Sequence, residues 1–111
     1  MNAIISIGFN VTQNGPHGRY QAPMDAETQW LFKNEVIEAV SKHLRGQVVQ
    51  KGFVSGYWEG QTEPSWTITM AMDEDAQQDI PSLKSSLSSI AFLFHQDCIA
   101  LTLAEPTFIS A

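Results

Sequence analysis

The sequence has little cysteine, little basic charge and no long apolar run. Its one cysteine, Cys98, excludes an internal disulfide and a cysteine-rich zinc site. Its six lysines and arginines never cluster, so we expect no nucleic-acid partner. The apolar stretch 3–9 is too short to span a membrane, and its flanks do not resemble those of a signal peptide. We therefore expect no membrane association.

Enough apolar sequence is present for one folded domain. The chain has 111 residues, of which 43% are hydrophobic and 16% charged, so we expect a single domain over 1–111. A net charge of −6 favours solubility, or contact with a basic partner. No His-x-x-x-His or similar spacing indicates a metal site, and we expect no cofactor. These features suggest a cytoplasmic protein.

The first half of the chain predicts a strand, a loop and a helix. Apolar side chains recur at every second position in 3–9, as in a strand. Gly, Pro and Asn are frequent in 10–23, which we expect to be a long loop. Asp25 then fits the N-cap of a helix that Gly46 can end. The apolar stripe of this helix contains Phe32, Val36, Ile37, Val40 and Leu44.

A hairpin is predicted next. Residues 47–58 form one strand, in which Gly52 and Gly56 could allow bulges or close packing. Residues 59–64 are expected to form the turn. Residues 65–72 alternate between apolar and small polar side chains, which is typical of a half-buried strand.

The last part of the chain predicts a second helix and a final strand. An acidic connection, 73–79, leads to a helix that Asp79 can cap and whose first turn tolerates Pro81. The final strand is expected at 98–103 and ends before Pro106. The apolar face of the helix contains Leu83, Leu87, Ile90, Ala91 and Phe94.

This order of elements predicts an α+β fold, the ferredoxin-like βαββαβ sandwich. It has a four-stranded antiparallel sheet with both helices on one face. The end of the first strand, the 57–64 hairpin and the 95–98 corner then meet at one end of the sheet, which we call the pole. The 10–23 loop emerges there as well. The residues expected at the pole are Asn10, His17, Tyr57, Trp58, Glu59, Glu63, His95, Gln96 and Asp97.

The stretch His95-Gln96-Asp97-Cys98 brings a histidine, an acid and the cysteine together. A nucleophilic cysteine needs a base within hydrogen-bond reach and an oxyanion hole, and this spacing guarantees neither. We expect instead a corner between helix and strand. There His95 ends the helix or bonds to the loop, and Cys98 packs on the strand.

Six residues at the pole are candidates for binding, and none is assigned a catalytic role. Trp58 is either a lid on the core or a wall on which a ligand stacks. Glu63 is either a solvated turn residue or an acid/base. Gln96 could simply tie loop backbone groups together. The candidates are Tyr57, Trp58, Glu63, His95, Gln96 and Asp97.

The face of the sheet away from the helices is predicted to be smooth and weakly polar. Such a face is either open to solvent or paired with a second copy in a homodimer. It lacks the stacked aromatic residues of an RNA-binding sheet. Its expected residues are Ser65, Thr67, Thr69, Ala71, Cys98, Ala100 and Thr102.

The sequence contains a set of short motifs at Gly8, Trp30, Glu35-Val36, Gly56-x-Trp58, Glu63 with Ser65, and Phe94-x-Gln96-Asp97. This set resembles a family of short, uncharacterised bacterial proteins of unknown function. The chain departs from the pattern in its 10–23 loop and in Pro64. The resemblance implies a ferredoxin-like fold and implies no activity.

The sequence favours a non-enzymatic binding or protein-interaction domain that uses the pole. By analogy, small acidic proteins of phages and mobile elements often act on a partner protein in this way. The alternative is a small-molecule enzyme or ligand-binding domain, with Glu63 or His95 as acid/base and Trp58 as the stacking wall. A third alternative is a structural subunit that self-associates through an edge strand.

Overall fold

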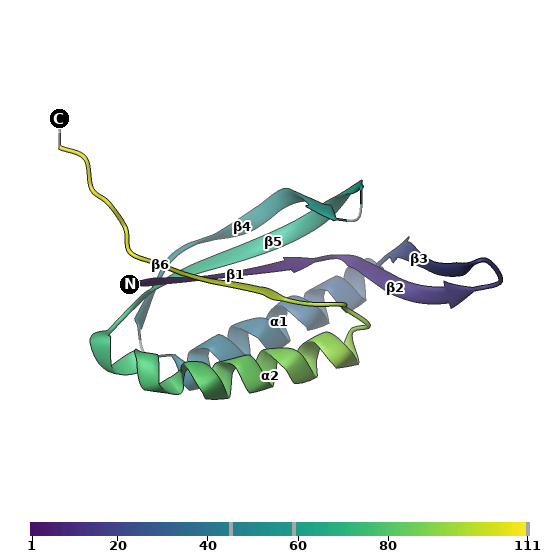
Figure 1. The fold of residues 1–111 in the computed structure, drawn as a ribbon. Coiled ribbons are helices and arrows are strands. Elements are labelled where there is room, and N and C mark those ends of the chain that lie inside the picture. Colours follow the sequence, from purple (N-terminus) through teal and green to yellow (C-terminus); the bar gives the residue numbers. More distant parts are fainter. Residues whose placement is uncertain (45, 59, 111) are drawn as a thin grey trace.

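The computed structural model describes residues 1–44, 46–58 and 60–110, and of Trp58 only the backbone. It has two layers, a sheet of long strands and a pair of helices on one of its faces (Figure 1). Glu59 and the side chain of Trp58, both predicted at the pole, lie outside the described residues. In chain order the elements are β1 (Asn2–Gly8), β2 (Asn10–Gly15), β3 (Gly18–Pro23), α1 (Ala26–His43), β4 (Gly46–Trp58), β5 (Gln61–Met72), the 3-10 helix η1 (Glu74–Asp79), α2 (Ile80–Leu93) and β6 (Ala100–Ala104).

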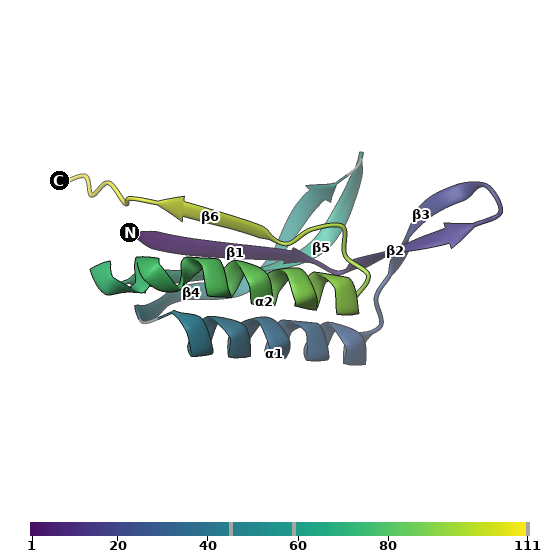
Figure 2. The same cartoon turned by 60° about the horizontal axis from the view of Figure 1, so that its bottom comes forward.

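The main sheet has the strand order β4-β5-β1-β6, and each neighbouring pair is antiparallel. Consequently β1 runs parallel to β4, and β5 runs parallel to β6. Each of α1 and α2 connects two of these parallel strands, and both helices cover the same face (Figures 1 and 2). This α+β arrangement is consistent with the predicted ferredoxin-like sandwich.

The core lies between the helices and one face of the sheet. Successive side chains of a strand point to opposite faces, so every second residue of β1 and β5 reaches the helices. Phe32 of α1 stacks on Phe94 with 4.8 Å between ring centroids and meets Phe9 edge-on at 6.4 Å. The predicted alternation is confirmed. The buried residues include Ala3, Ile5, Ile7, Trp66, Ile68, Met70, Val36, Val40, Leu83, Leu87 and Ile90.

The two helices begin differently. Asp25 caps α1 as predicted, and its Oδ1 accepts the backbone N–H of Thr28 at 2.7 Å. This hydrogen bond lowers the pKa of Asp25. Asp79 occupies the corresponding position of α2, but its side chain makes no capping hydrogen bond. The reason is its helical backbone conformation (φ −91°, ψ −4°), because a capping side chain usually extends from a β-region residue.

The first helix ends earlier than predicted. α1 ends at His43 rather than near Gly46, because Leu44 is already extended, with φ −111° and ψ 130°. None of the helices in the described ranges combines the length and apolar character needed to cross a membrane.

The expected 10–23 loop is a hairpin, which corrects the prediction. β2 pairs with β3 in register from Asn10↔Pro23 to Gly15↔Gly18, leaving Pro16 and His17 as the turn. Proline suits the second position of such a turn, and Gly18 (φ 106°) takes a conformation that favours glycine. The hairpin projects beyond the main sheet (Figures 1 and 2).

The β4–β5 hairpin is longer than predicted. β5 begins at Gln61, so most of the expected 59–64 turn is paired strand, and Glu63 lies opposite Gly56. The irregularity of β4 falls between Val48 and Gln50 rather than at Gly52 or Gly56. Backbone pairing with β4 therefore overrides the turn-forming residues between 59 and 64.

Two smaller boundaries also differ. The acidic 73–79 connection, for which no element was predicted, contains the 3-10 helix η1. The final strand begins at Ala100 instead of Cys98, because the chain is still completing the corner after α2.

Candidate functional site

The 95–98 corner ends α2 with a left-handed residue. His95 has φ 54°, its N–H donates to Phe92 O at 3.3 Å, and the N–H of Gln96 donates to Ala91 O at 2.8 Å. These two bonds form a Schellman motif, which usually has glycine at the left-handed position. The corner predicted for this stretch is therefore confirmed, and the backbone of His95 terminates the helix. Cys98, which was predicted to pack on the strand, is instead exposed and precedes β6.

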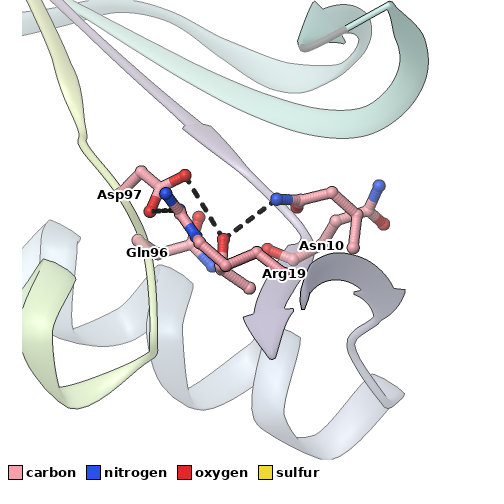
Figure 3. A network of polar contacts seen from close by, with 6 residues as sticks. Asn10, Arg19, Gln96 and Asp97 are labelled. Carbon is pink, nitrogen blue, oxygen red and sulfur yellow. Dashed lines mark hydrogen bonds and ion pairs between the residues drawn. The ribbon is translucent and has the colours of Figure 1, made fainter. Parts of the chain in front are cut away.

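Gln96 and Asp97 attach this corner to the β2–β3 hairpin, as Figure 3 shows. Gln96 Nε2 donates to the backbone oxygen of Asn10 at 2.7 Å. Asp97 forms an ion pair with Arg19 and accepts the Thr12 hydroxyl at 3.4 Å. The backbone N–H of Thr12 also donates to His95 O at 3.1 Å. Residues far apart in sequence thus hold the hairpin against the end of α2.

The carboxylate of Glu63 lies next to the first residue of this hairpin, Asn10. Glu63 is only 9% exposed, and its Oε2 accepts the backbone N–H of Asn10 at 2.9 Å. A Cβ added to Gly8 would lie 2.2 Å from Glu63 Oε1. The absence of a side chain at Gly8 therefore makes the room that the carboxylate occupies.

A second glycine supports the strand that carries Glu63. The Ser65 hydroxyl donates to the backbone oxygen of Glu63 at 3.0 Å. A Cβ on Gly56 would come within 2.4 Å of that hydroxyl oxygen. The close packing predicted for Gly56 is confirmed, whereas a Cβ on Gly52 would contact nothing within 4 Å.

These groups enclose a pocket on the open face of the sheet, at the pole. Its volume is about 160 Å³. Main-sheet strands form its floor, and the hairpin and the corner form its sides. The lining residues are Ser6, Ile7, Gly8, Asn10, Thr12, Gln21, Gly56, Tyr57, Glu63, Ser65, Gln96, Asp97, Cys98 and Ala100.

The pocket brings together four of the six predicted binding residues. Tyr57, Glu63, Gln96 and Asp97 all contribute to its lining. His95 does not, and lies instead in a wider depression with Arg19, Asn14 and Leu93. Trp58 stands at the end of β4 opposite Gln61, and its side chain lies outside the described residues.

Sequence reasoning missed the contribution of the hairpin. Thr12 and Gln21 line the pocket, and Arg19 pairs with Asp97 beside it. The Gly-Pro-His-Gly stretch at 15–18 is a turn signal that could have predicted this hairpin. Once the hairpin is recognised, its polar strands become candidates for the pole.

The two carboxylates of the pocket differ in their partners. Asp97 has the guanidinium of Arg19. Glu63 has a backbone N–H, and within the described ranges no lysine, arginine or histidine forms an ion pair with it. Across the same part of the chain, no three His, Cys, Asp or Glu side chains gather as ligands for a metal ion. Of the two carboxylates of the pocket, Glu63 is thus the one that forms no ion pair with a described residue.

Comparison with known proteins gives one distant similarity. No protein-family model matches the sequence, and no curated protein matches it. Among solved structures, the chain is similar to a phage SAM lyase in complex with S-methyl-5'-thioadenosine, with 17% identity and a TM-score of 0.45. The match covers 90% of this chain and 76% of the other.

Proposed function

We propose that this chain is a small-ligand-binding domain and that the pocket around Glu63 is its site. The observation that supports this is a carboxylate, 9% exposed, that faces a pocket and lacks a described cation. Burying a carboxylate is unfavourable unless hydrogen bonds or an opposite charge compensate for it. The Asn10 N–H compensates in part, and a bound ligand would supply the rest.

The chemistry of the lining suggests the class of ligand. A carboxylate only accepts hydrogen bonds, so its partner must donate them, and a positive charge strengthens the bond. Asp97 is already neutralised by Arg19, which leaves one uncompensated negative charge. We infer a small molecule that presents an ammonium group to Glu63.

We infer that the pocket binds a ligand without catalysing a reaction. His95 as the acid/base is not supported, because His95 does not line the pocket. Glu63 alone could still act as an acid/base, and this enzymatic alternative needs the same carboxylate.

The bacterial family, the cytoplasmic location and an origin in a phage or mobile element remain predictions.

The test uses titration calorimetry with a panel of small ammonium compounds, each paired with its neutral hydroxyl analogue. We expect the wild-type chain to bind a member of the panel and to discriminate against its neutral analogue. Glu63→Gln keeps the shape and removes the charge. Its affinity should fall roughly 10- to 100-fold, the equivalent of about 1.5–3 kcal/mol for a hydrogen bond to a charged group.

Glu74→Gln is the matched control, because it removes one negative charge from an exposed position in η1. It should bind as the wild type does. Equal loss in both variants would mean that only the net charge matters. A Glu63→Gln variant that binds as tightly as the wild type would refute the proposal.

A protein partner at the same pole is the second candidate function. Tyr57 is 75% exposed and Tyr20 of the hairpin is 50% exposed, and aromatic side chains are frequent in protein interfaces. The charge of −6 favours a basic partner surface. Such binding should weaken in Tyr57→Ser and at high salt but survive Glu63→Gln, which separates it from ligand binding.

A further inference from the structure

One edge of the main sheet is unusually apolar. β4 forms this edge in the part of the chain that the structure describes, and it has 13 residues. A long edge strand with exposed apolar side chains is a site where another chain can add. Its exposed apolar residues are Val48 (48%), Val49 (61%), Phe53 (70%), Val54 (49%) and Tyr57 (75%).

A second apolar segment follows the opposite edge. Residues 105–110 continue from β6 without regular structure and point away from the domain (Figures 1 and 2). Phe108 is 88% exposed and Ile109 is 93% exposed. Covering two large apolar side chains that are exposed in this way lowers the free energy of the system.

The β4 edge of the same copy does not cover this segment. β5 and β1 lie between β6 and β4, and residues 105–110 lead away from these strands. The β4 edge of a second copy has no such obstacle.

The charges of the two segments are complementary. β4 contains Lys51 and no acid, and Lys33 lies 5.1 Å from the ring centroid of Phe53. Residues 105–110 contain Glu105 and no base, and the exposed Glu105 carboxylate lies 3.4 Å from the N-terminal amine of Met1 in the same copy. In a chain with a net charge of −6, β4 is therefore a suitable place for an acidic segment of another copy to bind.

We propose that β4 of one copy binds residues 105–110 of a second copy. The segment would lie along the free edge of β4, as in other cases of strand addition, with Phe108 and Ile109 against its apolar residues. The two surfaces differ, so the contact is head-to-tail and builds a ring or an open chain of copies. This contact specifies the third alternative left open by the sequence, self-association through an edge strand, and it does not rest on the ligand proposal.

Light scattering coupled to size-exclusion chromatography tests the contact with the full chain. The wild type should have a mass that is a multiple of 12.3 kDa. The double variant Phe108→Ser and Ile109→Ser should fall to the mass of one copy. Both side chains are exposed, so its fold should persist, which circular dichroism checks. A wild type of single-copy mass at every soluble concentration, or equal masses for both proteins, would overturn the proposal.

A mixing experiment separates this contact from a symmetric one. Val49→Glu places an acid on β4 at an exposed position and should also yield single copies. The double variant retains an intact β4, and Val49→Glu retains an intact 105–110 segment. When the two variants are mixed, one copy of each should form a dimer, because the intact 105–110 segment of Val49→Glu can bind the intact β4 of the double variant. Variants that stay separate when mixed would contradict a head-to-tail contact, as would a double variant that still self-associates.

Discussion

The two faces of the central strands β1 and β5 differ in composition and in what covers them. On the face covered by the helices, apolar side chains such as Ile5 and Ile68 are almost completely buried. On the open face the same strands carry small or polar residues such as Ser6, Gly8 and Glu63. Because neighbouring residues point to opposite faces, one short segment can contribute to both. The covered face stabilises the fold, and the open face presents polar groups to the pocket.

Burial on the open face has a different origin from burial in the core. Glu63 and Ser65 are both buried there, although no helix covers them. The residues that line the pocket around them come from the base of the β2–β3 hairpin, from the β4–β5 hairpin and from the corner at Gln96. The pocket therefore depends on local packing at the pole, which a mutation can disturb while the core stays intact.

The largest expected effect is the loss of a ring from the covered face. Phe32→Ala should reduce the free energy of unfolding by about 3–5 kcal/mol, because Phe32 is fully buried between Phe9 and Phe94. Urea denaturation measures this change. Phe92→Ala, which removes an 83% exposed ring, is the control and should change stability by less than about 0.5 kcal/mol. Similar values for the two variants would contradict the difference between core and surface.

On the open face, Gly8→Ala should affect binding more than stability. The new Cβ would lie 2.2 Å from Glu63 Oε1, so the carboxylate must move. It is the end of a flexible side chain, and we expect the free energy of unfolding to fall by only about 1 kcal/mol as its hydrogen bond is lost. Ligand affinity should fall as far as in Glu63→Gln.

Gly52→Ala is the matched control for this prediction, because a Cβ at Gly52 contacts nothing within 4 Å. It should retain both binding and stability. Unchanged affinity in Gly8→Ala would mean that the position of the Glu63 carboxylate is unimportant for binding.

The smallest expected effect concerns the corner. His95→Gly should raise the free energy of unfolding by about 0.5 kcal/mol, since glycine adopts the left-handed conformation without a steric penalty. Ligand affinity should stay the same, because His95 does not line the pocket. His95→Ala keeps the backbone strain and should bring no gain in stability. Loss of binding in both variants would instead show that the His95 imidazole takes part in binding.

Most of the core could be predicted because its signal is local and periodic. The alternation in 65–72 and the four-residue repeat from Phe32 to Val40 both identify buried faces correctly. Four of the six binding candidates were placed together by one further step, the topology that brings distant ends to one pole. The hairpin at 10–23 was missed because its strands are mainly polar and carry no strong apolar alternation.

The sequence by itself determined the α+β class, the cap of α1 and the residues of the core, because propensity, capping and periodicity are properties of neighbouring residues. Only the tertiary structure decided the role of Glu63. Its sequence neighbours Thr62 and Pro64 suggest a turn, but pairing with Gly56, the open space above Gly8 and the N–H of Asn10 turn it into a buried acceptor. Those partners are distant in sequence, and a buried charge is set by what surrounds it in space.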